Sequence, residues 1–193
     1  DAALELWIKE LRRLRSTLEE ELEVEISDEK LWDAIKKVNH ETMAVKAICD
    51  LNKMNPPVLS GLDLLTVTWS RNFSSDKEEL FTMLNELQQE LAANQESQAN
   101  ANKPRVLLTG CPVGLGSEKV IRLVEESGGS IVAMENCSGY KTLELQSDTE
   151  LNDPIIALAR KYMEIPCSCM SPNPYRFELL ERMLKEFLVD AVI

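Results

Sequence analysis

The chain has 193 residues, of which 44% are hydrophobic and 28% are charged. This length and composition are typical of one large or two small globular domains. The formal net charge is −12, which opposes binding to nucleic acid or to an anionic membrane surface. The longest uncharged stretch around Cys111, Val106–Ser117, is far shorter than the roughly 20 apolar residues of a membrane-spanning helix. We therefore expect no nucleic-acid partner and no membrane span.

The first part of the chain, residues 1–103, predicts an all-helical segment. Apolar residues recur at helical spacing in three runs, at about residues 4–24, 28–54 and 76–91. Leu62–Trp69 is apolar as well and predicts a short helix near the active centre. The polar run Ala92–Lys103 is typical of an exposed helix end or a linker.

The second predicted helix contains Cys49 and the single histidine of the chain, His40. Val38 and Cys49 fall on its apolar stripe, so we expect both to be buried and interpret Cys49 as a core residue. His40 lies off this stripe beside Glu41. We expect it to face solvent or to support a neighbouring group, and a chain with one histidine does not favour a histidine-based hydrolase.

The second part, residues 104–193, predicts an α/β domain. The pattern predicts two buried strands, at Arg105–Thr109 and Ser130–Met134. A predicted helix at Ser117–Ser127 joins them into a βαβ unit. The alternation continues with helices at about 153–164 and 175–188 and a terminal strand at 191–193. The predicted fold class is α/β, a Rossmann-like or flavodoxin-like parallel sheet preceded by the all-helical segment.

Four of the five cysteines follow residue 110, in loops punctuated by glycine or proline. Cys111 and Cys137 each follow a predicted strand, and Cys167 follows Ile165-Pro166, where we expect a very short third strand. Ligands of open parallel sheets bind beyond the carboxyl ends of the strands. We therefore expect these three thiols to converge at one edge, with Cys169 as a weaker candidate.

Converging thiols in loops favour an iron–sulfur cluster, which needs several thiolates at one point. A disulfide framework is disfavoured, because five thiols cannot all pair and a chain of this size can form a core without cross-links. Zinc is also disfavoured, since its sites more typically show two close C-x-x-C pairs. Ordinary buried thiols and redox cysteines stay open as alternatives. We expect a reducing, cytoplasmic setting.

The glycines at 110, 114 and 116 follow a strand and precede a helix, so a phosphate-binding loop is one interpretation. The spacing does not fit, because Pro112 and Leu115 stand where a dinucleotide fingerprint needs glycine and no Gly-Lys pair is present. We expect these glycines to form the turn that exposes Cys111, with backbone N–H groups facing cluster sulfurs. A purely structural role in the turn stays open.

Four motifs in this order carry a family resemblance: V-L-L-T-G-C-P at 106–112, E-N-C-S-G at 135–139, I-P-C with S-P-N-P-Y-R at 165–176, and V-D-A-V-I at 189–193. They resemble the 2-hydroxyacyl-CoA dehydratase family, also called the 2-hydroxyglutaryl-CoA dehydratase D-component or benzoyl-CoA reductase-like family. The nearest branch is the single-subunit group that includes double-cubane cluster proteins. The resemblance covers residues 105–193, and the helical part matches in general layout.

The resemblance implies an oxygen-sensitive iron–sulfur cluster, either a 4Fe-4S cluster or a double cubane, held by Cys111, Cys137 and Cys167. It implies a lyase that removes water from an acyl-CoA through a ketyl radical, after an ATP-hydrolysing iron–sulfur activator has supplied one electron. The double-cubane members are instead low-potential reductases of small molecules. The expected partners are the activator and a second subunit, in a homodimer or heterodimer.

Further residues stand close to the expected ligands. Glu135, Lys141 and Asn173 are candidates for supporting them, and Lys141 and Arg176 supply positive charge near thiolates, with ordinary surface charge as the alternative. Longer family members carry an N-terminal α/β domain and a further cysteine after the strand that corresponds to 189–193. We therefore expect the chain to be a fragment that is inactive alone.

Two other functional classes stay open at this stage. One is a non-catalytic α/β scaffold or interaction subunit with buried structural cysteines. The other is a flavin or nucleotide binder that uses the loop from Gly110 to Gly116.

Overall fold

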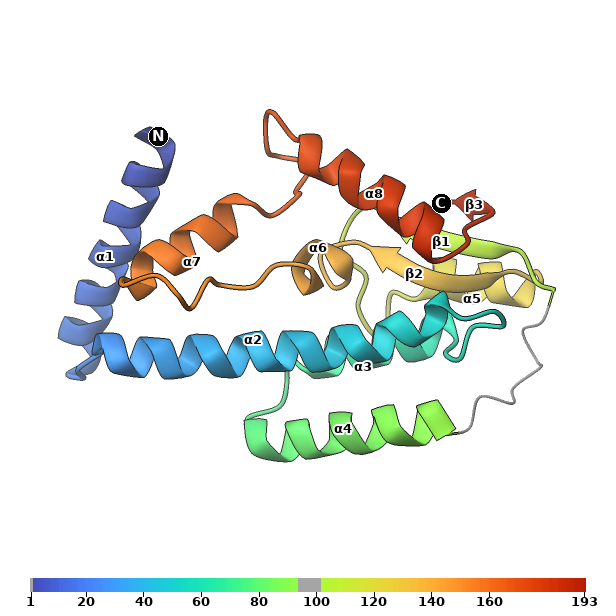
Figure 1. The fold of residues 1–193 in the computed structure, drawn as a ribbon, viewed down its shortest axis with the longest axis horizontal. Helices are drawn as coiled ribbons and strands as arrows, with labels where there is room; N and C mark the ends of the chain where they lie inside the picture. The colour runs from blue at the N-terminus through green and yellow to red at the C-terminus, as the bar shows by residue number, and fades with distance from the viewer. Residues whose placement is uncertain (1, 94–101) are drawn as a thin grey trace. The chain divides into compact units, whose positions relative to one another are not determined.

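A computed structural model describes residues 2–93 and 102–193 (Figure 1). The chain divides into two compact units that interleave along the sequence: Asp1–His40 with Leu145–Ile165, and Glu41–Glu144 with Pro166–Ile193. Helices from the first part of the sequence thus belong to the same unit as the strands from the second part. Most of the predicted polar linker, residues 94–101, lies outside the described residues.

The first unit consists of helices packed on one another. Helix α1 (Ala2–Leu22) contacts α7 (Pro154–Met163), and the beginning of α2 (Asp28–Asp50) belongs to the same unit. Arg12 forms an ion pair of 2.8 Å with Asp153, whose carboxylate also accepts hydrogen bonds from the first backbone N–H groups of α7. This N-cap satisfies donors that would otherwise lack a partner and begins α7 where the sequence predicts it.

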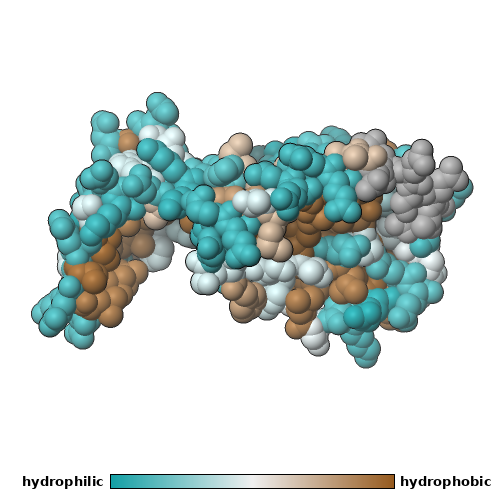
Figure 2. Space-filling view, turned by 90° about the horizontal axis from the view of Figure 1, so that it is seen from below, coloured by the Kyte–Doolittle hydropathy of each residue, from teal (hydrophilic) through white to brown (hydrophobic). Residues whose placement is uncertain are grey.

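Helix α1 is amphipathic, as predicted, but no residue along it is buried. Its apolar surface includes Leu14 and Leu18, and this unit shows apolar atoms at its surface in Figure 2. The prediction that Val38 is buried is wrong, since its exposed fraction is 46%. His40 is exposed, as expected. None of the described helices is long and apolar enough to cross a lipid bilayer.

The second unit is built on a three-stranded parallel sheet of order β2-β1-β3, and the predicted α/β class is confirmed. The strands are β1 (Arg105–Thr109), β2 (Ser130–Glu135) and β3 (Ala191–Val192). Almost all of β1 and β2 is buried, which accounts for their continuous apolar sequences. The expected third strand at Ile165-Pro166 is wrong, because the described chain has no strand there. Pro166 has no N–H to donate to a ladder.

Helices cover this sheet and supply most of its core (Figure 1). Helices α3 (Gly61–Ser70) and α5 (Lys119–Glu126) contact β2 and each other. Their approach is close, since a Cβ atom on Gly61 would lie 2.7 Å from the Cβ atom of Ile131. The remaining elements of the unit are η1 (Leu51–Lys53), α4 (Lys77–Ala93), α6 (Tyr140–Leu143) and α8 (Pro174–Glu186).

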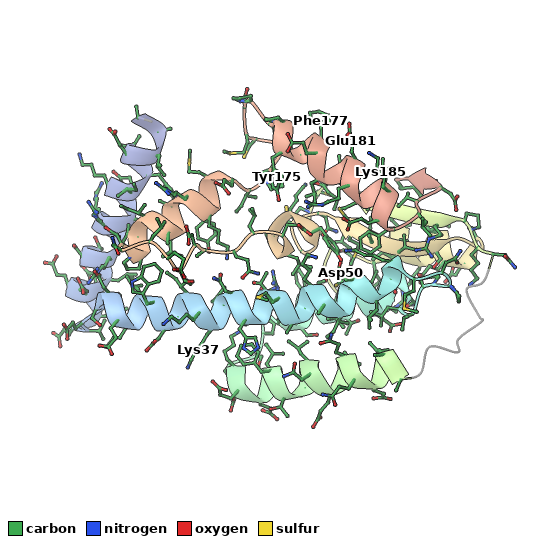
Figure 3. All side chains as sticks on the ribbon, in the orientation of Figure 1. Lys37, Asp50, Tyr175, Phe177, Glu181 and Lys185 are labelled. Carbon is green, nitrogen blue, oxygen red and sulfur yellow. The ribbon has the colours of Figure 1, made fainter. Side chains whose placement is uncertain are left out.

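Helix α8 shows how these helices divide between core and solvent. Leu179 and Met183 of this helix are buried, whereas Phe177 is 67% exposed. Figure 3 labels Phe177, Glu181 and Lys185, which follow one another at a spacing of four residues along the exposed side of the helix. Leu179 and Met183 thus lie on the face of α8 that joins the hydrophobic core.

Candidate functional site

The loops that carry Cys111 and Cys137 lie side by side at the carboxyl edge of the sheet. The backbone N–H of Gly110 donates to the carbonyl oxygen of Glu135 at 3.2 Å, which continues the contact between β1 and β2 beyond the strands. The Ser138 hydroxyl donates to the carbonyl oxygen of Val113 at 3.0 Å and joins the two loops again. Both cysteines are exposed.

Cys167 lies in the loop before α8 and is partly exposed. Its carbonyl oxygen accepts a hydrogen bond of 2.6 Å from the Asn173 side chain, so this predicted supporting residue fixes the backbone of a cysteine loop. A backbone hydrogen bond from Cys169 lowers the pKa of the Cys167 thiol, and the Cys169 side chain and the charge of Lys141 act in the same direction. The Cys167 thiol in turn raises the pKa of Cys169, so Cys167 is the thiol of this pair that ionises first.

Glu135 is the centre of a buried charged group at the same edge, which we call the Glu135 triad: Glu135, Lys141 and Arg176. Its carboxylate is fully buried, and Oε1 lies 3.6 Å from Lys141 Nζ and 3.5 Å from Arg176 Nε. The Thr109 hydroxyl donates to Oε2. The ammonium of Lys141, a residue with 3% of its side chain exposed, donates to the Gly110 carbonyl oxygen at 2.9 Å. The alternative of ordinary surface charge is therefore wrong for Lys141.

Several buried polar atoms at this edge have no hydrogen-bond partner among residues 2–93 and 102–193. They include Glu135 Oε1, Asn136 Nδ2 and Arg176 Nε. A buried polar atom without a hydrogen bond costs free energy, so these three atoms call for an explanation. Asn136 and Thr109 were not singled out from the sequence, although both stand next to or within two residues of a candidate ligand.

The glycine loop after β1 forms the expected turn, with positive φ at Gly110 and Gly116. A Cβ atom on Gly114 would lie 2.6 Å from the Trp69 ring, so this half-buried tryptophan of α3 braces the Cys111 loop. The backbone N–H groups of Gly114 and Gly116 donate to the side chains of Ser117 and Glu118. The expectation that these amides face cluster sulfurs is therefore wrong for both.

The family model of 2-hydroxyglutaryl-CoA dehydratase, D-component, matches residues 1–193. The chain belongs to this family. It is 43% identical over 194 residues to "Putative dehydratase subunit YjiM" of Escherichia coli (strain K12). The aligned region covers 100% of this chain and 50% of that protein. The chain thus spans about half the length of the curated relative that it matches. The resemblance to this family is confirmed, and it includes the helical first part of the sequence.

Thiols are the ligands that an iron–sulfur cluster, the cofactor expected from the sequence resemblance, would need. Cys111, Cys137 and Cys167 are exposed or partly exposed, the Lys141 ammonium holds the backbone directly before Cys111, and the Asn173 amide holds the backbone at Cys167. The net positive charge of the Glu135 triad suits thiolates, which are the form that binds iron. Within residues 2–93 and 102–193, no three side chains of His, Cys, Asp or Glu are grouped closely enough to hold a metal ion.

Cys49, the fifth cysteine, is not available as a ligand at the sheet edge. Cys49 is 2% exposed on α2, and burial raises its thiol pKa to about 12. The prediction that Cys49 is a core residue is confirmed.

Proposed function

We propose that this chain is the iron–sulfur part of a 2-hydroxyacyl-CoA dehydratase or of a related low-potential reductase, with Cys111, Cys137 and Cys167 as cluster ligands. The observation that carries the proposal is the Glu135 triad, since Lys141 is bonded to the Cys111 loop and Arg176 stands in α8 directly after the Cys167 loop. Family membership supports the reaction class. The cluster, as a 4Fe-4S cluster or a double cubane, would supply single electrons at low potential.

The residues of this chain would position and charge the thiols. The Lys141 ammonium holds the Gly110 carbonyl and thereby fixes the residue directly before Cys111. The Asn173 amide holds the backbone at Cys167, whose lowered thiol pKa favours the thiolate. Trp69 restricts the same loop as Lys141 from the side of α3. Together they would keep three thiolates oriented while iron is bound.

The substrate and the partners belong to the same proposal. The substrate is an acyl-CoA or another small molecule, and the electron comes from an ATP-dependent iron–sulfur activator in the cytoplasm. A second subunit, in a homodimer or heterodimer, completes the enzyme, and the description of the relative as a putative dehydratase subunit supports this part. Because the chain spans half of that relative, we propose that substrate binding involves sequence beyond these 193 residues.

The test is anaerobic reconstitution of the chain with iron and sulfide, followed by measurement of iron and acid-labile sulfide. We expect about four or eight irons per chain, according to whether one or two cubanes form. Cys111→Ala, Cys137→Ala and Cys167→Ala are each expected to lose most of this iron. Cys49→Ala is the matched control, because it removes a buried thiol from the same unit, and it is expected to keep the iron. Wild-type protein without iron, or full iron in all three loop variants, would overturn the proposal.

A non-catalytic α/β scaffold is the second candidate. The observation in its favour is that the described side chains do not form a ready-made metal site. It predicts iron-free protein and equal behaviour of all the cysteine variants. A flavin or nucleotide binder gains less support, since the Glu118 carboxylate accepts from the Gly116 N–H in the glycine loop, where a phosphate would need that donor.

A further inference from the structure

The two cations of the Glu135 triad differ in their surroundings. The side chains of Glu135 and Lys141 are 0% and 3% exposed, whereas 23% of the Arg176 side chain is exposed. A fully buried carboxylate needs a cation beside it, and the buried Lys141 ammonium, 3.6 Å from Oε1, meets this need. Arg176 therefore brings one positive charge more than the burial of Glu135 requires.

The guanidinium of Arg176 is held on one side only. Its Nε atom is buried and lies 3.5 Å from Glu135 Oε1. The terminal nitrogens, Nη1 and Nη2, have no acceptor among residues 2–93 and 102–193, and they are not among the buried atoms that lack a partner. These two nitrogens are therefore in contact with solvent, while Glu135 fixes the opposite side of the group.

The other arginines show that this arrangement is specific to Arg176. Most of them place a terminal nitrogen on an oxygen atom of another described residue: Arg12, Arg13, Arg15, Arg71, Arg105, Arg122 and Arg182. Arg160 and Arg176 have no such contact within the described part of the chain, and Arg160 is exposed. Arg176 alone thus combines partial burial and a buried carboxylate at Nε with terminal nitrogens that no described residue uses.

We infer that Arg176 binds the carboxylate group of a small-molecule ligand at the carboxyl edge of the sheet. The two terminal nitrogens of a guanidinium match the two oxygens of a carboxylate in a planar, bidentate pair. The triad has one net positive charge, which one carboxylate neutralises, whereas a phosphate monoester carries about −1.5 to −2 at neutral pH. The inference goes beyond the proposed function and does not depend on a cluster.

The position of Arg176 suits a ligand site. It lies in the first turn of α8, and Glu135, at the end of β2, accepts from the Thr109 hydroxyl at the end of β1. Ligands of parallel sheets bind beyond this end of the strands. Figure 3 labels Tyr175, the residue directly before Arg176, at the beginning of α8. The Asn173 side chain does not cap the helix, since it donates to the Cys167 carbonyl oxygen. The first N–H groups of α8 therefore add to the positive potential near Arg176.

The experiment measures how a carboxylate protects arginines from phenylglyoxal, a reagent that modifies guanidinium groups. The folded, metal-free chain is labelled with and without glutarate at constant ionic strength, and mass spectrometry follows each site. We expect glutarate at about ten times its Kd to slow the modification of Arg176 about tenfold. Arg160 is the matched control, since it also lacks a partner among the described residues, and its rate is expected to stay unchanged. No protection of Arg176, or equal protection of both arginines, would overturn the inference.

Ligand-observed NMR with glutarate is the second measurement, on the wild type and on three variants. We expect Arg176→Gln to abolish binding, Arg176→Lys to weaken it because an ammonium cannot form the bidentate pair, and Arg160→Gln to keep the wild-type Kd. Equal Kd values in Arg176→Lys and wild type would overturn the bidentate assignment. Inorganic phosphate that protects Arg176 better than glutarate would overturn the choice of a carboxylate.

These outcomes are distinct from those of the iron test. If the chain binds no iron but glutarate protects Arg176, the proposed function fails and this inference stands. If the loop cysteines hold iron and glutarate does not protect Arg176, this inference alone fails.

Discussion

Lys141 Nζ lies 2.9 Å from the carbonyl oxygen of Gly110, although the two residues are 31 positions apart. The contact joins the short helix after Cys137 to the turn directly before Cys111. A buried ammonium thus connects the two loops at the carboxyl edge of the sheet, in addition to the Ser138 hydrogen bond to Val113. The contact holds the backbone of the residue directly before Cys111.

Lys141→Met is expected to lower the free energy of unfolding by about 1.5–3 kcal/mol, because it removes a charged hydrogen bond and leaves the Gly110 carbonyl without this donor. Urea denaturation of the metal-free chain measures the change. Lys119→Met, at an exposed position of α5, is the control and is expected to change stability by less than about 0.5 kcal/mol. Equal effects of the two substitutions would contradict the structural role of Lys141.

Gly114→Ala is expected to destabilise the chain by about 1–3 kcal/mol, since the new methyl group would overlap the Trp69 ring. In a Trp69→Ala background the same substitution has room and is expected to cost much less. A double-mutant cycle of unfolding free energies measures this coupling. Additive effects of the two substitutions would show that Trp69 does not brace the Cys111 loop.

The lowered pKa of Asp50 predicts that the free energy of unfolding of the second unit depends on pH. Burial opposes its ionisation, but hydrogen bonds from Lys46, Tyr140 and Lys53 outweigh burial and lower its pKa. The stabilisation is therefore fully present above the unfolded value of about 3.9 and is lost as the pH falls through the lower folded pKa. We expect Asp50→Asn to lower the unfolding free energy by about 1.5–3 kcal/mol at neutral pH, and the difference from wild type to narrow below about pH 4. A difference that does not change with pH would contradict this assignment.

The cysteines are expected to fall into two classes of reactivity toward a thiol reagent in metal-free, folded protein. Cys111 and Cys137 are exposed and react promptly, whereas Cys49 is buried and reacts only on unfolding. Mass spectrometry after timed labelling assigns each site. Labelling of Cys49 as fast as Cys111 would show that α2 is not packed as described.

The strands and most helices follow from local sequence. Arg105–Thr109 is predicted and found with the same bounds, because this short apolar run is bounded by Pro104 and Gly110, which favour a buried strand over a helix. The run at Ile165-Pro166 gives a similar local signal but forms no strand, since it offers too few backbone donors for a ladder. Helix α6, at Tyr140–Leu143, was not predicted, because four residues carry no helical periodicity.

The candidate site follows from sequence only in part. The pattern of strand followed by cysteine places Cys111 and Cys137 at one edge correctly, since parallel strands share a direction. The contacts of Lys141 with Gly110, and of Arg176 with Glu135, join segments that only the tertiary fold brings together. For this reason the sequence suggests positive charge near the thiolates, while the burial of Lys141 and its shared carboxylate emerge from the structure.

We propose that Cys111, Cys137 and Cys167 hold an iron–sulfur cluster. Mössbauer spectroscopy of the anaerobically reconstituted chain, loaded with isotopically enriched iron, distinguishes sulfur-coordinated cluster iron from adventitious iron. We expect cluster iron in the wild type and in Cys49→Ala, and its loss in Cys137→Ala. Only adventitious iron in the wild type, or the same cluster signal in Cys137→Ala, would contradict it.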